Sequence, residues 1–310
     1  MLVGIQTGGI TEKYGNEKGY RMIRDAGFEA IDWNLDHALP RTKLEKATEL
    51  KNICIFEEDL DSVMAHYEKE LDIIRQNGLV ISQAHAPFPA YMPERPEMLD
   101  YTIGIYKRCI EFCDAVGCKN LVIHGISSAP DDPDNTLDDI KALNYKLYES
   151  LIDTLKTTNV KVCLENLPSK YKLTSTIYEL CEGICSNPYE AVEYIDTLNQ
   201  KAGKDCFGLC LDTGHLHLTK KRFNAYLPIV NNRICALHIH DNTALFDTHK
   251  APYSGTILWD EFTEEMNKIE YNGDLCFETF RQMSVPEELS PVFLKLIYEI
   301  GCYFRKEITK

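Results

Sequence analysis

The chain has 310 residues, of which 44% are hydrophobic, with a formal net charge of −15 at pH 7 and a pI near 5.1. A chain of this length can bury a large core, and its acidic balance disfavours partners held through phosphates, nucleic acid included. No run of about 18 apolar residues predicts a membrane span, and neither the opening MLVGIQTGG nor the 12 scattered cysteines suggests secretion, so we expect a cytoplasmic protein.

Short apolar runs rich in β-branched residues alternate along the chain with longer stretches of helical spacing. Eight of these runs predict strands, at residues 2–7, 30–35, 80–86, 120–124, 161–166, 207–212, 234–240 and 274–279. The intervening helical patterns include 57–76, 97–116, 137–158 and 188–199, and a last helix is expected at 286–308. Glycines at 27, 78, 117 and 273 follow helical stretches, as C-terminal caps do.

Eight strand-then-helix units without a composition break favour one α/β domain over residues 1–310, a single (β/α)8 TIM barrel. An open doubly wound sheet is the alternative. It would usually carry a glycine-rich phosphate loop after the first strand, and Gly8-Gly9-Ile10 does not match one. Residues 168–186 are too long for a simple strand-to-helix turn and predict an insertion, either a lid over the barrel mouth or an inert elaboration.

The carboxyl ends of the predicted strands carry acidic residues and histidines, where barrels of this kind hold their reactive groups. Seven of the nine histidines lie at these strand ends or in the loops that follow them. The seven include His217, which is close to His215 in the sequence; His37 and His66 are the two outside. The strand-end residues are His85, His124, Glu165, Asp212, His215, His238, His240 and Glu278, with Asp247 and His249 in the loop after the seventh strand.

The alternation of side chains along a strand points Glu165, Asp212 and Glu278 into the barrel, above three cysteines that we interpret as a packing layer. These cysteines are Cys163, Cys210 and Cys276. Three carboxylates in a dry site would destabilise one another without a cation. A mixed Asp, Glu and His shell suits Mn²⁺, Zn²⁺ or Co²⁺, so we expect a divalent metal.

Several strand-end motifs together resemble the xylose isomerase-like barrel superfamily, which includes sugar-phosphate isomerases, ketose 3-epimerases and apurinic-site endonucleases. The resemblance spans nearly the whole chain. Its motifs are AHAP around His85, VIHG around His124, LENLP around Glu165, LDTGH from Asp212 to His215, HIHDN from His238 to His240, DTH from Asp247 to His249 followed by GTI, and FET around Glu278.

The resemblance implies a single-metal site made by Glu165, Asp212, one strand-seven histidine and Glu278. A His-x-x-Asp pattern selects His238 and a His-x-His pattern selects His240, and we favour His238. The implied activity is isomerisation or epimerisation of a sugar or sugar phosphate through an enediolate, with Glu165 and Glu278 transferring protons. His215 would hold a substrate hydroxyl, and Trp33 or Phe88 could pack on the sugar.

The endonuclease branch of the superfamily implies more ligands, for three zinc ions. Additional metal or substrate contacts would then be His85, His124, His215, His240, Asp247 and His249, so between one and three ions are expected. Zinc-dependent cleavage at apurinic sites is therefore the alternative function, although the only basic candidates for DNA or a sugar phosphate are Lys170, Lys172, Lys220, Lys221 and Arg222.

Two further questions stay open at this point. Tyr253 stands where the resemblance leads us to expect glycine, which leaves the shape of that loop in doubt. An inactive barrel that serves as a sugar sensor is a third hypothesis, disfavoured by the intact Glu165 and Glu278. The identity of the sugar and the oligomeric state, a homo-oligomer included, do not follow from the sequence.

Overall fold

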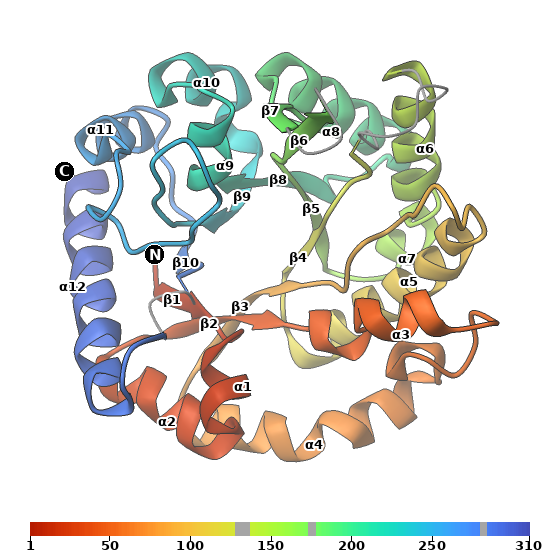
Figure 1. Cartoon of the computed structure of the whole chain (residues 1–310), viewed down its shortest axis with the longest axis horizontal. Helices are drawn as coiled ribbons and strands as arrows, with labels where there is room; N and C mark the ends of the chain where they lie inside the picture. The colour runs from red at the N-terminus through yellow and green to blue at the C-terminus, as the bar shows by residue number, and fades with distance from the viewer. Residues whose placement is uncertain (128–136, 173–177, 280–283) are drawn as a thin grey trace.

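The computed structural model, which describes residues 1–127, 137–172, 178–279 and 284–310, is an α/β barrel (Figure 1). Eight parallel strands form one sheet in the order β10-β1-β2-β3-β4-β5-β8-β9. Their bounds are β1 Val3–Gln6, β2 Ala30–Asn34, β3 Val80–His85, β4 Asn120–Ile123, β5 Lys161–Glu165, β8 Phe207–Asp212, β9 Ile234–His238 and β10 Leu275–Phe277.

Hydrogen bonds beyond the end of β9 close the sheet into a barrel. The Ile239 amide donates to the Cys276 carbonyl at 2.9 Å, and the Glu278 amide donates to the Ile239 carbonyl at 3.1 Å. The predicted (β/α)8 barrel is therefore confirmed, and the alternative of an open doubly wound sheet is wrong. Strand β9 ends two residues earlier than expected: Ile239 makes only an isolated bridge to Phe277 of β10, and Asp241 pairs with Lys250 of the following loop.

Helices form a ring outside the strands, as Figure 1 shows. Their bounds are α1 Ile10–Tyr14, α2 Asn16–Ala26, α3 Arg41–Lys46, α4 Leu60–Gln76, α5 Met98–Val116, α6 Leu137–Glu149, α7 Ile152–Lys156, α8 Pro188–Ala202, α9 Thr213–Leu218, α10 Phe223–Val230, α11 Trp259–Lys268 and α12 Ser290–Ile308, with short 3₁₀ turns at Asp36–Ala38, Ile55–Glu57, Asn231–Arg233 and Glu287–Leu289. Local sequence sets several ends: the Asp59 side chain accepts from the Ser62 amide at the start of α4, and left-handed Gly117 ends α5.

The single helix predicted at 137–158 is wrong, since two helices, α6 and α7, occupy this stretch. Ser150 lies between them, and its hydroxyl donates to the Lys146 carbonyl at 2.6 Å. A serine that bonds back to the preceding turn tends to bend a helix. The next residue, Leu151, donates its amide to the Tyr148 carbonyl, which is a tighter turn than an α-helix makes.

Apolar side chains lie on both sides of the barrel wall. The residue directly before each of the three strand-end carboxylates faces outward, into the main core between the sheet and the helices. These residues are Leu164, Leu211 and Phe277. Inside the barrel, Val122, Cys163, Cys210 and Ala236 form a second, smaller cluster, and Cys276 is also fully buried. Cys163, Cys210 and Cys276 are buried free thiols, in keeping with a packing role.

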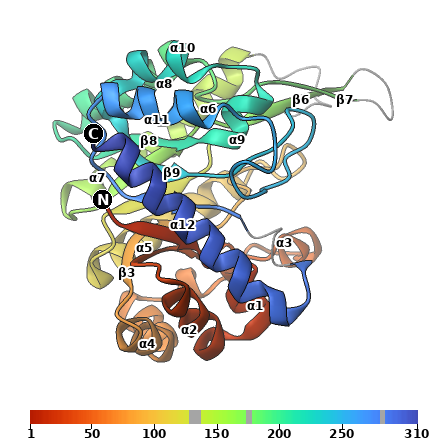
Figure 2. The ribbon, with the colours of Figure 1, turned by 90° about the vertical axis from the view of Figure 1, so that its left-hand side faces the viewer.

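Residues 168–182 leave the barrel as an antiparallel hairpin of β6 Pro168–Lys172 and β7 Tyr178–Glu182. Figure 2 shows this hairpin projecting from the same end of the barrel as the loop after β9. Residues 173–177 of the predicted insertion lie outside the described residues, and the lid function stays a prediction. Among the helices of the described ranges, none combines the length and the apolar character needed to cross a membrane.

Candidate metal centre

The carboxyl ends of β5, β8, β9 and β10 bring together the four residues expected to hold a metal. One donor atom from each of Glu165, Asp212, His238 and Glu278 lies within 4.8 Å of the others, and all four side chains are buried. His238 is at the centre: its Nδ1 is 3.1 Å from Glu165 Oε1, 3.6 Å from Glu278 Oε2 and 4.0 Å from Asp212 Oδ2. These are the distances of donors that could share one ion.

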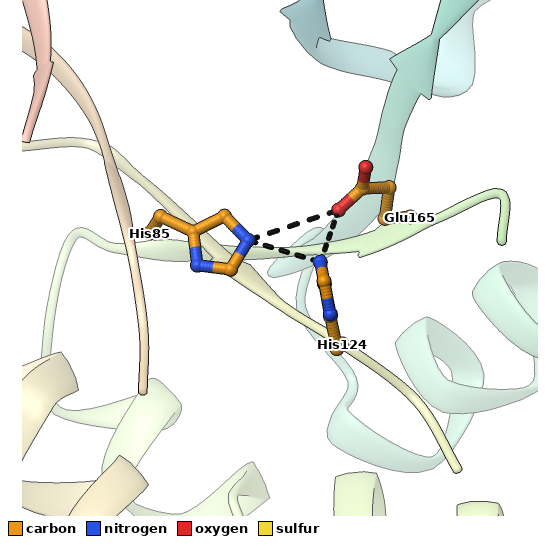
Figure 3. A group of neighbouring side chains, drawn as sticks. All are labelled: His85, His124 and Glu165. Carbon is orange, nitrogen blue, oxygen red and sulfur yellow. Dashed lines mark hydrogen bonds and ion pairs between the residues drawn. The ribbon is translucent and has the colours of Figure 1, made fainter. Parts of the chain in front are cut away.

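A second group of donors joins Glu165 to the ends of β3 and β4 (Figure 3). Glu165 Oε2 lies 2.7 Å from His124 Nε2, and His85 Nε2 is 3.0 Å from the same His124 nitrogen. His85 donates its Nδ1–H to the Ala86 carbonyl at 2.8 Å, which turns the lone pair of Nε2 toward the other two donors. Burial lowers the pKa of His85 to about 3, so this ring is neutral and able to ligate.

Two overlapping groups share His240 on the other side of the barrel mouth. Asp212, His215 and His240 form one, and His240, Asp247 and His249 form the other. His240 Nε2 is 3.0 Å from Asp212 Oδ2, and His249 Nε2 is 3.0 Å from Asp247 Oδ2. The His240 and His249 rings are stacked with centroids 4.1 Å apart. All the strand-end residues named from the sequence therefore converge, and Glu165, Asp212 and His240 each belong to two groups.

The charges of these side chains are balanced against one another. Burial alone would raise the pKa of Glu165, but the His238 and His124 rings hold it well below its ordinary value. Burial alone would lower the pKa of His215 and of His238, yet neighbouring groups raise both well above the ordinary range: carboxylates, Asp212 first, for His215, and Cys210 followed by Glu278 and Glu165 for His238. Without a cation, protonated rings therefore keep the buried carboxylates ionised.

Several buried donor atoms have no hydrogen-bond partner among the described residues, which tests whether a cation fits. They are Glu165 Oε2, His215 Nδ1 and His240 Nδ1. Glu165 Oε2 lies 2.7 Å from His124 Nε2 without hydrogen-bond geometry, and the two atoms are close enough to share one ion. Buried polar atoms are rarely left unpaired, and a divalent ion would satisfy them. The donor set thus fits a metal.

The site makes the stability of the metal-free protein depend on pH. Burial disfavours the charged ring of His249, but Glu278 and Asp247 outweigh it and raise the pKa from 6.5 to about 9. The stabilisation that His249 gives the folded protein is fully present below pH 6.5 and is lost as pH rises through 9; at 1.36 kcal/mol per unit it is on the order of 3 kcal/mol.

We therefore expect the melting temperature of chelator-treated protein to fall between pH 6.5 and pH 9, and His249→Asn to flatten that slope. Exposed His66 lies outside the site, so His66→Asn is the matched control and should leave the slope unchanged. An equal slope in the wild type and in the His249 variant would contradict the expectation. Metal affinity should change in the opposite direction, rising with pH as the rings lose their protons.

The two aromatic residues proposed to stack on substrate lie in different places. Phe88 lines the pocket above the metal centre, is 39% exposed, and has its ring 4.7 Å from that of His124. Trp33 faces the opposite way: it is buried between the sheet and α4 and α5, against Tyr67 and Phe112. Side chains alternate along β2, and Trp33 is on the face that points away from the barrel interior. Trp33 is therefore not a substrate contact.

Polar residues of β1 and β2 that had not been singled out also reach the centre. The Gln6 amide donates to Glu278 Oε1 at 2.8 Å, and His238 Nε2 is 3.0 Å from Asp32 Oδ2. Both side chains are almost fully buried. Their signal in the sequence is an inward-facing polar residue near the end of an otherwise apolar strand.

The loop after β9 is held in shape by another residue that was missed, Asp241. Its carboxylate accepts from the Gly255 amide, the Ile257 amide and the Trp259 ring nitrogen, at 3.0 to 3.2 Å. Any side chain at Gly255 would meet Asp241 at 2.2 Å, so this close approach requires glycine. Tyr253, at the position where the resemblance led us to expect glycine, adopts φ +68, in the left-handed region that favours glycine.

A pocket of about 380 Å³ opens above the donor groups. Besides the donors, polar residues such as Gln6, Glu12, Asn34 and Asp36 line it, and the lining contains no lysine or arginine within the described part of the chain. Arg281, in the loop after β10, lies outside the described residues. A small polar ligand would fit this space and meet both carboxylates and rings.

Comparison with known proteins identifies similar sequences and folds. The sequence model of the "Xylose isomerase-like TIM barrel" family matches residues 20–295. The "uncharacterized protein y4fM" of Sinorhizobium fredii is 26% identical over 83% of this chain and 79% of that protein. A "probable endonuclease 4" of Staphylococcus carnosus is 23% identical over 75% of this chain and 73% of that protein.

Solved structures with the same fold include sugar epimerases. D-allulose 3-epimerase from Methylomonas sp. superposes with a TM-score of 0.66 at 15% identity, over 99% of this chain and 96% of that one. The 3-keto-D-glucoside 4-epimerase of E. coli gives a TM-score of 0.67 at 15% identity, over 96% of this chain and 99% of that one. At these identities the similarity establishes the fold alone.

Proposed function

The chain belongs to the xylose isomerase-like TIM barrel family, and from this premise we propose that it is a divalent-metal-dependent sugar isomerase or epimerase. The observation that carries the proposal is the convergence of Glu165, Asp212, His238 and Glu278, two of which, Glu165 and Glu278, line a pocket of about 380 Å³. The activity rests on this geometry, and the sugar epimerases among the structural neighbours support it.

Glu165, Asp212, His238 and Glu278 would hold the cation, with Mn²⁺, Co²⁺ or Zn²⁺ the best match to this donor set. When bound there, a divalent ion would polarise neighbouring carbonyl and hydroxyl oxygens of a sugar and acidify the C–H between them. What favours such an ion in this protein is that four buried donor atoms, three of them from carboxylates, lie within 4.8 Å of one another.

Glu165 and Glu278 are proposed to move the proton. They come from the ends of β5 and β10, and both line the pocket, so both carboxylates could reach a substrate bound there. One carboxylate would remove a proton from carbon to give an enediolate, and the other would return one. Gln6 donates to Glu278 Oε1, whereas Glu278 Oε2 faces the His238 and His249 rings at 3.6 and 3.4 Å and is the oxygen proposed to take part.

His215 and Phe88 are proposed to hold the substrate. His215 lies between Glu165 and Asp247, within 3.4 Å of each, where its ring can reach a sugar hydroxyl. Phe88 offers an exposed ring at the rim that can cover the apolar face of a sugar. The absence of basic side chains among the described lining residues favours an unphosphorylated sugar over a sugar phosphate.

Exchange of carbon-bound hydrogen tests this function directly. With Mn²⁺ or Co²⁺ and a panel of ketoses and aldoses in ²H₂O, we expect one deuterium to enter product at the carbon that changes, detected by NMR or mass spectrometry. The reason is that a carboxylate proton equilibrates with solvent during a proton-transfer reaction. Conversion without any deuterium uptake would argue for transfer of hydride or for a shielded proton, and no conversion with any tested sugar would oppose the proposal.

Phosphodiester hydrolysis at abasic DNA is a second candidate, favoured by the presence of several donor groups rather than one. Against it, Lys221 is paired with Glu182 and Arg222 with Glu261, which leaves exposed Lys170 and Lys220 as basic groups; the side chain of Lys172 lies outside the described residues. Three zinc ions per chain in protein purified without chelator, with cleavage of an abasic duplex, would favour it. One manganese or cobalt would favour the isomerase.

A further inference from the structure

A buried carboxylate outside the donor groups contacts the central histidine of the metal centre. Asp32 is fully buried at the inner face of β2, and its Oδ2 is 3.0 Å from His238 Nε2. A carboxylate can only accept, so the His238 Nε2–H donates to Asp32. The opposite ring nitrogen, Nδ1, faces Glu165 and Glu278.

The fold specifies the position of Asp32 closely. A register irregularity between Ile31 and Asp32 sets Asp32 opposite Gln83 of β3. The Gln83 amide donates both to Asp32 Oδ2 at 3.0 Å and to the Leu237 carbonyl at 3.2 Å. Leu237 directly precedes His238, so Gln83 ties the carboxylate to the backbone that carries the ring. The hydrogen bonds of Gln83 and His238 to Oδ2 hold the carboxylate in this orientation, whereas its Oδ1 has no hydrogen-bond partner among the described residues.

The arrangement decides which nitrogen of His238 can serve as a ligand. A cation among Glu165, Asp212 and Glu278 would take the place of the proton on Nδ1, so the remaining ring proton has to be on Nε2. Asp32 is placed to hold that proton and to make the ring a better donor, as carboxylates behind ligating histidines do. Without Asp32, the ring could turn or hold its proton on the wrong nitrogen.

We propose that Asp32, supported by Gln83, is a positioning residue that fixes the tautomer and orientation of His238 for metal binding. The inference rests on the proposed function, because it presumes a cation at the Glu165, Asp212, His238 and Glu278 group. Asp32 itself touches neither ion nor substrate; it acts through His238.

The test measures Co²⁺ affinity by competition with a chromophoric chelator, together with the visible absorption spectrum of bound Co²⁺. Asp32→Ala should bind Co²⁺ roughly 10- to 100-fold more weakly than the wild type, the usual cost of losing such a partner. Asp32→Asn keeps an accepting oxygen and should lose less, with a shifted Co²⁺ spectrum. The matched control is Asp274→Asn, which removes a charge from a hydrogen-bonded aspartate that accepts from the Leu2 amide and Ser82.

A second readout is measured on the wild-type protein, so it does not depend on the folding of an Asp32 variant. The ¹⁵N shifts of the His238 ring in Zn²⁺-loaded protein, assigned with a His238→Gln variant, should show Nε2 protonated and Nδ1 free of a proton. A proton on Nδ1, or Co²⁺ affinities of both Asp32 variants equal to that of Asp274→Asn, would overturn the proposal. If the wild type binds no Co²⁺, both the proposed metal centre and this inference fail. If the wild type binds Co²⁺ and the Asp32 variants bind it equally tightly, only the inference about Asp32 fails and the proposed function stands.

Discussion

Glu278→Gln will lower the rate of net sugar conversion by roughly 10²- to 10⁴-fold, the range that a positioned acid–base group contributes. Glutamine has nearly the same shape and can still accept from Gln6, but it cannot take or return a proton at neutral pH. If each glutamate serves one face of the substrate, Glu165 can still remove a proton from the unchanged substrate and return solvent hydrogen to the same face. Deuterium uptake into unconverted substrate should therefore fall much less than product formation does.

The measurement compares product formation and deuterium uptake in the same reaction, at Co²⁺ concentrations shown to saturate the variant. Glu264→Gln, on the outer face of α11, makes the same chemical change at an exposed position and should keep the activity of the wild type. Conversion by Glu278→Gln within a few-fold of the wild type would refute the assigned role. Parallel loss of exchange and conversion would instead indicate that one glutamate handles the proton on both sides.

The strand ends that build the metal centre could be predicted from the sequence because two simple regularities coincide there. Side chains alternate along a strand, so Cys163 and Glu165 share one face while Leu164 takes the other, and this holds in the structure. In a parallel barrel all strand ends meet at one mouth, so residues far apart in sequence become neighbours. Those two rules suffice to gather Glu165, Asp212 and Glu278.

Other features lay beyond those rules because they depend on irregularities and on side-chain contacts. Asp32 lies next to a register irregularity in β2 and β3, and its pairing with His238 crosses the barrel interior. The alternation of side chains along β2 places Trp33 on the outer face of the barrel. The prediction that it contacts sugar relied on its aromatic ring and did not take this alternation into account. The choice between His238 and His240 also needed distances: His238 reaches Glu165 and Glu278, whereas His240 reaches Asp212.

The shared donors have a consequence for any ion bound here. Because Glu165 belongs to the groups on both sides, a cation in one group would change the charge that the neighbouring group presents to a second cation. The number of ions and the choice of metal are therefore linked, and a variant at Glu165 should disturb more than one site. Variants at Glu278, which belongs to a single group, separate catalysis from ion number more cleanly.

Removing the metal will abolish turnover and lower the melting temperature, since the buried carboxylates then depend on protonated rings alone. A cation that binds only the folded chain stabilises it by about 2.7 kcal/mol at a free concentration of 100 times its Kd, which for a chain of this size corresponds to a rise in Tm on the order of 5 °C. Thermal unfolding of chelator-treated protein, followed during addition of Mn²⁺, Co²⁺ or Zn²⁺, measures this effect. The rise should be larger at pH 8 than at pH 6, because at pH 6 the ion has to displace protons from rings such as His249, whose pKa is raised to about 9. A melting temperature that no added divalent ion changes at either pH would show that the donor groups do not act as a metal site.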